Sequence, residues 1–337
     1  MSRPLDVVLC GYYGFGNLGD ELMAEGLLAL LKENGVPGKR VAVLSAPEGA
    51  PLKGPGATLV DRWNPAKVMS ALRSGRTLLL GGGGLFQDST STRSCAYYWG
   101  VTRMARLAGC RPWAFGQSIG PLRRSTARFL ARDALTLCRE RVVRDKGSKE
   151  LLESWGLESE VAPDPAFAMA RGFPGGGDGD LLLVNIRPWG RGLPEATALA
   201  AALVRERSGL DLVGVALSDE DKALMADFKS RGVFNPSRIV RIRGIDEARE
   251  LWPEAKAAMG MRFHFCLLSV LAGVPCLAVP YDPKVRSFAE EWDLPLWDGG
   301  EPPSFQQDPP RGPSLGEVAG TLEEVFRRTL EAMLTGE

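Results

Sequence analysis

The sequence predicts an α/β fold that contains two doubly wound parallel sheets. Short apolar runs that are typical of buried strands alternate with longer segments of helical period. Most of these runs end in a glycine-rich or charged loop. A glycine- and proline-rich stretch, RGFPGGGDGD at residues 171–180, divides the chain near its middle. A chain of 337 residues is also long enough for about two domains.

The first half contains five apolar runs that we expect to form buried strands. They lie at residues 5–10, 41–44, 77–80, 112–115 and 141–143. Segments of helical period separate them, at residues 22–32, 96–108, 125–138 and 149–155. Alternation of this kind with short connections indicates a parallel sheet with helices on both faces.

The second half repeats this alternation. Expected strands lie at residues 181–186, 210–217, 238–242, 259–261 and 274–280. Expected helices lie at residues 195–207, 222–229, 245–252 and 265–271. A proline-rich loop at residues 302–313 and a final helix at residues 315–334 close the chain. The sequence therefore predicts a second sheet of similar size.

These elements define the expected domains. We expect an N-terminal domain at residues 1–172, a linker at 173–180, and a C-terminal domain at 181–314. The helix at 315–337 is expected to pack back on the first domain. Two Rossmann-like domains facing each other across a cleft resemble the GT-B glycosyltransferase architecture.

Composition excludes several classes of function. Lys and Arg together number 41, and so do Asp and Glu, so no basic excess favours nucleic acid or anionic lipid. No apolar run is long enough to span a membrane, and the N-terminus lacks the apolar core of a signal peptide. Six scattered cysteines predict free thiols in a reducing cytoplasm. A single histidine rules out a histidine-based metal cluster, and we expect no cofactor.

The only histidine, His264, lies in the stretch KAAMGMRFHFCLLSVLAGVPCLAVPYDPKVR at residues 256–286. Arg262 and His264 fall at a predicted strand-to-helix turn. A helix N-terminus favours an anion, a guanidinium matches carboxylate or phosphate, and an imidazole transfers protons near neutral pH. Two structural alternatives stay open: a hydrogen-bonded core histidine, and an arginine that caps a carbonyl group.

The first loop, GYYGFGNLGDE at residues 11–21, contains a literal GxGxxG motif. Its glycines begin four residues after the strand, and its acids would repel a pyrophosphate, so it argues against dinucleotide binding. Asn17, Asp20 and Glu21 suit sugar hydroxyls instead, and a carboxylate can accept a hydroxyl proton. The alternative for Asp20 is a helix cap.

Further polar residues follow other predicted strands, on the edge where ligands of open α/β sheets bind. The candidates for substrate binding are Gly83, Gln87, Asp88, Gln117, Arg144, Arg187 and Lys284. For Arg144, a local salt bridge with Asp145 is the structural alternative.

With these residues in place, the chain resembles the bacterial polysaccharide pyruvyl transferases, and most closely their CsaB branch. Six motifs carry the resemblance in order along the chain: GYYGFGNLGDE, GGGGLFQD, GQSIGP, VRD, MRFH and YDPKV. Two positions depart from the usual pattern: Ser118 replaces a glycine, and Phe263 replaces a leucine. Neither change removes a charged group.

The resemblance implies transfer of pyruvate from phosphoenolpyruvate to a sugar, with the acceptor side on the domain at residues 1–172 and the donor side on the domain at residues 181–314. In the CsaB branch the acceptor is N-acetylmannosamine on a lipid-linked cell-wall polymer precursor, and the product is a 4,6-ketal that anchors surface-layer proteins. The resemblance also implies a cytoplasmic enzyme, and peripheral contact with the membrane stays open. The expected catalytic residues are His264 as the proton donor, Arg262 as an anion holder and Asp20 as the base. A sugar-nucleotide glycosyltransferase and a non-catalytic polymer-assembly subunit are the alternatives.

Overall fold

The computed structural model describes residues 3–47, 56–89, 91–190, 192–301 and 312–335. The chain divides into two compact units. The first comprises Met1–Phe15, Asp20–Ala168 and Gly316–Glu337, and the second comprises Gly16–Gly19 and Met169–Leu315. Within the second unit, the amide of Leu18 donates to the carbonyl of Leu217 over 3.0 Å. Residues 173–180, the expected linker, lie in the second unit.

The first unit contains a seven-stranded sheet in the order β3-β2-β1-β4-β5-β6-β7, and every pairing in it is parallel. The strands are added outward from β1 to β3 on one side, and after α2 the chain continues with β4 on the other side of β1, so the direction of winding reverses between β1 and β4. The strands are β1 (Leu5–Cys10), β2 (Val41–Ser45), β3 (Thr58–Asp61), β4 (Gly75–Gly83), β5 (Arg111–Gln117), β6 (Arg141–Val143) and β7 (Glu160–Val161).

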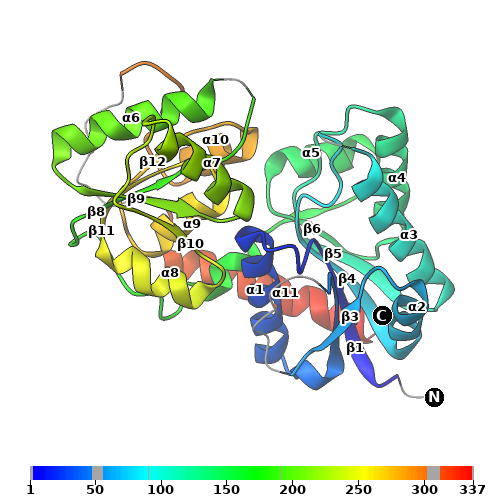
Figure 1. Cartoon of the computed structure of the whole chain (residues 1–337). Helices are drawn as coiled ribbons and strands as arrows, with labels where there is room; N and C mark the ends of the chain where they lie inside the picture. The colour runs from blue at the N-terminus through cyan, green and yellow to red at the C-terminus, as the bar shows by residue number, and fades with distance from the viewer. Residues whose placement is uncertain (1–2, 48–55, 90, 191, 302–311, 336–337) are drawn as a thin grey trace. The chain divides into compact units, whose positions relative to one another are not determined.

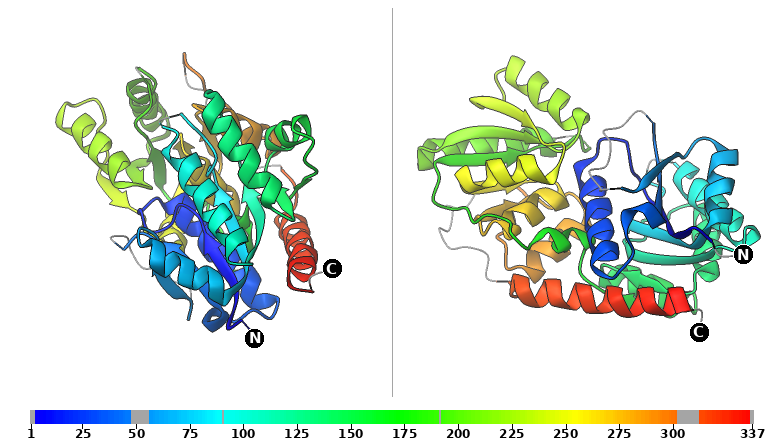
Figure 2. Two further views of the ribbon diagram at one scale, coloured as in Figure 1. Left: turned by 90° about the vertical axis from the view of Figure 1, so that its right-hand side faces the viewer. Right: turned by 90° about the horizontal axis from the view of Figure 1, so that it is seen from below.

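Helices cover both faces of this sheet (Figure 1). Alternate strand residues such as Val8 and Leu80 form one apolar core with the helices α2, α3 and α4. On the opposite face, the ring of Phe326 from α11, drawn in red in Figure 2, lies 5.9 Å from Trp113 and 5.0 Å from Phe115. The helices are α1 (Leu18–Glu33), α2 (Pro65–Ser74), α3 (Arg93–Leu107), α4 (Ser125–Leu137), α5 (Lys146–Ser154) and α11 (Leu315–Thr335), with short 3₁₀ turns at Gly38–Arg40 and Pro165–Met169.

The second unit repeats the design with a five-stranded sheet in the order β10-β9-β8-β11-β12, again parallel throughout. Its direction of winding reverses between β8 and β11. The strands are β8 (Leu181–Asn185), β9 (Asp211–Ala216), β10 (Arg238–Arg241), β11 (Ala255–Gly260) and β12 (Cys276–Ala278).

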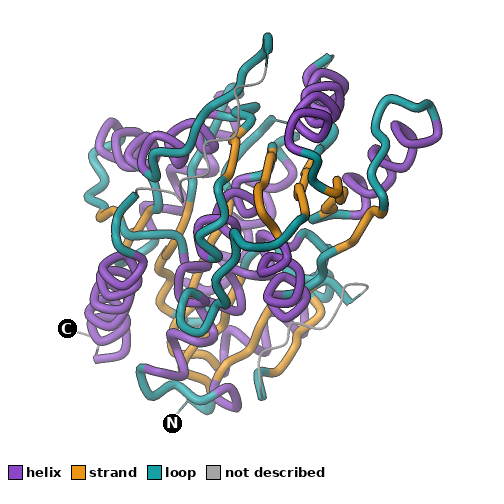
Figure 3. The backbone as a smooth tube through the Cα atoms, turned by 90° about the vertical axis from the view of Figure 1, so that its left-hand side faces the viewer, coloured by secondary structure: helices purple, strands orange, loops and turns teal. Residues whose placement is uncertain are grey.

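Helices also enclose the second sheet. The helices α6 and α7 share an apolar core with one face, through residues such as Ala201 and Phe228. On the other face, Trp252 beside α8 contacts Phe265 of α9, with ring centroids 5.5 Å apart. Figure 3 traces the strands of both sheets in orange between purple helices. The helices are α6 (Leu193–Ser208), α7 (Asp219–Ser230), α8 (Ile245–Leu251), α9 (Phe263–Leu271) and α10 (Pro283–Glu291), with a 3₁₀ turn at Trp252–Glu254.

The predicted α/β fold with two doubly wound parallel sheets is confirmed. Individual elements differ from the expectation. Helix α1 begins at Leu18 rather than at residue 22, because the positive end of the helix dipole accommodates Asp20 and Glu21 in its first turn. Strand β3 was not predicted, since its burial is only partial and its apolar run is short. Helices α2 and α10 were also missed, although an Asn or Asp cap followed by proline marks the start of each.

Two composition-based expectations concern the whole chain. Each of the six cysteines is buried as a free thiol. No helix in the described part of the chain is long and apolar enough to cross a membrane. The predicted proline-rich loop at residues 302–313 lies almost entirely outside the described residues.

Candidate active site

The candidate site of the second unit lies where its sheet changes winding direction. Helices α6 and α9 follow β8 and β11 onto opposite faces of the sheet. The loops at the carboxyl ends of these two neighbouring strands therefore diverge, and a crevice opens there in folds of this kind. Arg187 follows β8, and His264 follows β11. Lys284 follows β12, the next strand in the sheet.

Arg262 is the N-cap of α9, and its backbone amide donates to Oδ1 of Asn185 over 3.0 Å. Its guanidinium faces Asp221, with Nε donating to Oδ2 and Nη2 donating to Oδ1, each over 2.6 Å. Nη2 also donates to the hydroxyl of Ser218 over 2.8 Å. Asp221 is completely buried, so this is a desolvated ion pair. The guanidinium fork of Arg262 is thus engaged by a carboxylate of its own unit.

His264 lies in the first turn of α9 and is half-buried. The ring of Phe263 meets it edge-on, with centroids 5.0 Å apart. Within the same unit, Gly19 lies so close that an added Cβ would be 2.2 Å from Nδ1 of His264. A side chain at position 19 would therefore force the His264 ring to move.

Arg187 and Tyr281 form the second contact of this edge. Nη1 of Arg187 donates to the Tyr281 hydroxyl over 2.6 Å, and its guanidinium carbon lies 4.4 Å from the Tyr281 ring centroid. Burial raises the pKa of Tyr281, although the cations Arg187 and Arg262 oppose this shift. The hydroxyl therefore stays protonated at neutral pH. Lys284 lies in the first turn of α10, whose cap Asp282 accepts from the Lys284 amide over 2.9 Å.

The first unit has its own polar cluster at the reversal point between β1 and β4. Asp20 and Glu21 of α1 are both nearly buried. The Glu21 carboxylate accepts from the amide of Gly14 over 2.8 Å. Gly83 has φ of 99°, and a Cβ there would lie 2.7 Å from Oδ1 of Asp20. Desolvation and the nearby Asp20 and Glu21 carboxylates raise the pKa of Tyr13 well above its usual range. The structure thus brings two acids, a phenol and a tight glycine turn together.

Two more predicted residues lie on this edge. Gln117 is fully buried, and its side-chain amide donates to the carbonyl of Leu80 over 3.0 Å. Arg144 forms a buried ion pair with Asp164 and lies 3.4 Å from the sulfur of Met23. The alternative for Arg144, a local salt bridge with Asp145, is wrong, because Arg144 pairs with Asp164.

Asp145 binds Ser148 and Ser118 instead of Arg144. Its carboxylate caps α5 by accepting from the Ser148 amide, and it accepts from the Ser118 hydroxyl, each over 2.7 Å. Ser118 is one of the two positions that depart from the family pattern. Its hydroxyl therefore fixes the loop after β5 rather than disturbing the charged groups.

Asp88 is used differently from the other acids. Its two carboxylate oxygens accept from the amides of Arg123 and Arg124 over 2.8 and 2.7 Å. These hydrogen bonds lower the pKa of Asp88. The neighbouring Gln87 side chain accepts from the amide of Ser89 over 2.8 Å. Both side chains hold the loop backbone, and Asp88 lies below the surface with 1% exposure.

Sequence reasoning missed the carboxylates that hold the arginines. Asp221 follows Ser218 by three residues at the start of α7. This spacing is typical of a helix cap and does not indicate that Asp221 also binds Arg262. Asp164 lies just before the 3₁₀ turn at Pro165–Met169, without any local motif. Tyr281 begins the YDPKV motif, which gives no sign that its hydroxyl accepts from Arg187. Each of these contacts joins elements that are distant in sequence, so only the fold reveals them.

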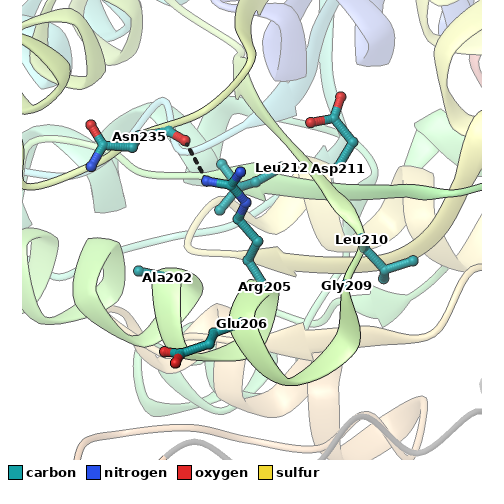
Figure 4. A pocket seen from close by; sticks show the side chains of 8 residues that line it. All are labelled: Ala202, Arg205, Glu206, Gly209, Leu210, Asp211, Leu212 and Asn235. Carbon is teal, nitrogen blue, oxygen red and sulfur yellow. Dashed lines mark hydrogen bonds between the residues drawn. The ribbon is translucent and has the colours of Figure 1, made fainter.

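A cavity of about 590 Å³ lies elsewhere in the second unit (Figure 4). Arg205 at the end of α6 donates to the carbonyl of Asn235 across it over 3.2 Å. Asp211 and Leu212, which also line it, begin β9. The cavity therefore opens at the amino end of the sheet, opposite to the edge that carries His264.

Comparisons with known proteins agree with this arrangement. The sequence model named polysaccharide pyruvyl transferase matches residues 17–283. Among curated proteins, no match to the chain is found. Solved structures with the same two-domain GT-B fold include Anabaena Alr3699/HepE in complex with UDP-glucose, at 13% identity, a TM-score of 0.56 and coverage of 98% of this chain and 97% of that chain. The UDP-N-acetylglucosamine 2-epimerase of Rickettsia bellii follows at 8% identity, a TM-score of 0.58 and coverage of 99% and 100%.

At identities this low, the solved structures show only a shared fold. The type of reaction is inferred from the family match. That match begins in the acid-bearing loop after β1 and ends at the start of α10, so it includes the loops at both winding reversals. The chain therefore belongs to the polysaccharide pyruvyl transferase family, and it is an enzyme that transfers pyruvyl groups.

Proposed function

We propose that the chain transfers the pyruvyl group of phosphoenolpyruvate to a sugar and forms a 4,6-ketal. The observation that carries the proposal is that Arg187, His264 and Lys284 follow the neighbouring strands β8, β11 and β12 at the carboxyl edge of the second sheet. As in the CsaB branch that the motifs resemble, we propose N-acetylmannosamine on a lipid-linked cell-wall precursor as the acceptor. The reaction would take place at the cytoplasmic face of the membrane, and the product would anchor surface-layer proteins.

The donor carries two anionic groups, a phosphate and a carboxylate. Arg187 and Lys284 supply positive charge at this edge, and the first turn of α9 adds backbone amides and the positive end of its dipole. Arg262 serves in this proposal by holding the start of α9, since Asp221 and Ser218 bind its guanidinium. The anion-binding role that the sequence suggested for Arg262 passes mainly to Arg187.

His264 would protonate the methylene carbon, C3, of the donor. Carbon C2 then becomes electrophilic, and the first sugar hydroxyl forms a C2–O bond. Cleavage of the bond between C2 and the phosphate oxygen releases phosphate, and the second hydroxyl closes the ring on C2. Two hydroxyl protons are lost in total: one balances the proton gained by C3, and the other leaves with phosphate.

Asp20 is the proposed base for the acceptor hydroxyl, with Glu21 and Asn17 orienting the sugar. Asp20 belongs to the first unit and His264 to the second. Gly83 and Gln117 shape the acid-bearing edge, and Arg144 lies beside it in its ion pair with Asp164.

The decisive experiment combines purified protein, phosphoenolpyruvate and a lipid-linked disaccharide that ends in N-acetylmannosamine. We expect release of phosphate in step with the mass gain of one pyruvyl ketal, and loss of both in Asp20→Asn. If the protein instead consumes a UDP- or GDP-sugar and ignores phosphoenolpyruvate, the donor assignment is wrong. If Asp20→Asn keeps normal turnover, the base is another residue.

A further inference from the structure

A group of touching aromatic rings lies at the carboxyl edge of the first sheet. We call Tyr12, Phe15, Trp63 and Tyr97 the aromatic platform. The rings of Tyr12 and Phe15 stack with centroids 4.1 Å apart and planes 12° apart. Trp63 meets Phe15 at 6.1 Å and Tyr97 at 5.7 Å, both edge-on. The four rings therefore form one continuous row.

Loops and helices after three strands supply these rings. Tyr12 and Phe15 follow β1, Trp63 follows β3, and Tyr97 lies in α3 after β4. Ligands of doubly wound sheets bind at this carboxyl edge. Asp20, the proposed base, lies in the first turn of α1, only five residues after Phe15. The platform thus belongs to the acceptor side of the chain.

Arg62 lies beneath the platform and fixes it. Its guanidinium carbon is 4.3 Å from the ring centroid of Tyr97, 5.0 Å from that of Phe15 and 5.3 Å from that of Trp63. The side chain is only 4% exposed, and its Nη1 donates to the carbonyl of Gly11 over 2.6 Å. Cation–π contacts of this kind hold aromatic rings in place. The row is preorganised rather than a collection of mobile side chains.

Three of the four rings are exposed to solvent, and Tyr97 is half-buried. Tyr12 is 42% exposed, Phe15 37% and Trp63 57%. Contiguous aromatic surface of this kind is unfavourable in water unless a ligand covers it. An aromatic ring has a negative face, which attracts the weakly positive C–H groups on the apolar face of a pyranose. A row of rings also offers contact to more than one sugar of a chain.

We propose that the aromatic platform binds the acceptor saccharide by stacking on the sugar rings that precede the pyruvylated residue. The inference rests on the proposed function for the identity of the acceptor. A bilayer surface is the competing occupant. The Asp61 carboxylate, which accepts from the Trp63 amide over 2.9 Å, borders the platform and disfavours anionic lipid. The cation that would attract such lipid, Arg62, is buried under the rings.

The test compares Trp63→Ala with Phe129→Ala, a control on α4 whose side chain is 64% exposed and outside the platform. With a soluble disaccharide containing N-acetylmannosamine, we expect Trp63→Ala to raise the acceptor KM about five- to tenfold. The KM for phosphoenolpyruvate and the melting temperature should stay unchanged. Trp63→Phe should restore most of the affinity, and Phe129→Ala should match the unmodified protein.

A second measurement separates this inference from the proposed function. Saturation-transfer NMR with the disaccharide alone detects sugar contact without any donor or turnover. Signal transfer that is lost in Trp63→Ala supports the platform even if phosphoenolpyruvate proves to be the wrong donor. Equal transfer in both proteins overturns the platform, even where ketal formation is normal. If Trp63→Ala loses binding to anionic phospholipid vesicles but keeps its contact with the saccharide, these rings bind the membrane instead.

Discussion

Both carboxylate oxygens of Asp221 accept hydrogen bonds from the guanidinium of Arg262, each over 2.6 Å. Asp221 also accepts from the amide of Leu217 over 3.1 Å. The ion pair joins the start of α7 to the start of α9. It thereby fixes the turn that carries His264.

Replacement of Asp221 tests this relationship. Asp221→Ala should lower the free energy of unfolding by about 3–5 kcal/mol, because it leaves the buried charge of Arg262 without its partner. Asp227→Asn is the matched control on the same helix, since Asp227 pairs with Arg231 at an exposed site. That control should change stability by less than about 0.5 kcal/mol. Urea unfolding of the full chain measures both, and equal midpoints would refute a stabilising role for the pair.

His264→Gln should lower the pyruvyl transfer rate by at least about a hundredfold, the scale of positioned acid catalysis. The side chain is half-buried, so folding should be preserved. Phosphate release under saturating substrates gives the rate, and circular dichroism checks the fold. Near-normal turnover would reject His264 as the proton donor.

Arg187→Ala should weaken donor binding. Loss of one charge-assisted contact to phosphoenolpyruvate should raise the donor KM about ten- to hundredfold. Arg205→Ala is the control, because Arg205 lines the cavity at the opposite edge of the same sheet. A donor KM that rises equally in both variants would show that general charge, rather than a built site, attracts the donor.

Asp88 predicts a pH effect on stability. Its pKa is lowered from the usual 3.8, chiefly by the hydrogen bond from the Arg123 amide, so its ionised form stabilises the fold. This contribution is complete above about pH 4 and is lost as the pH falls through the lowered value. Asp88→Asn should therefore be less stable than the unmodified protein at pH 7, and the gap should narrow below pH 4. Thermal melting across this range measures it, and a gap independent of pH would argue against the ionised form.

Phe326→Ala tests how α11 is held on the first unit. The ring is fully buried against Trp113 and Phe115, so its removal should lower the free energy of unfolding by about 3–5 kcal/mol. Arg327→Ala, on the exposed side of the same helix, should have little effect. If the two variants unfold at the same urea concentration, the packing of this helix contributes no stability.

Local pattern was enough to predict most elements of the fold. Leu5–Cys10 and Arg141–Val143 are strands with the predicted bounds, because their apolar runs end abruptly in glycine or charge. Elements with weaker patterns escaped prediction. Strand β3 is half-exposed, and α10 begins at a proline that reads equally well as a loop. Burial pattern and capping are local properties, so they predict a strand or helix only where the local pattern is strong.

The sequence by itself determined the α/β class, the two sheets and the position of His264 at a strand-to-helix turn, because periodicity and turn residues act over a few positions. Only the tertiary structure decided which group each charged side chain meets. Arg262 pairs with a carboxylate 41 positions away, and Arg62 lies under rings from three separate segments. These partners come together because of the order of the strands in the sheet. No short stretch of sequence shows which distant residues will be neighbours in the fold.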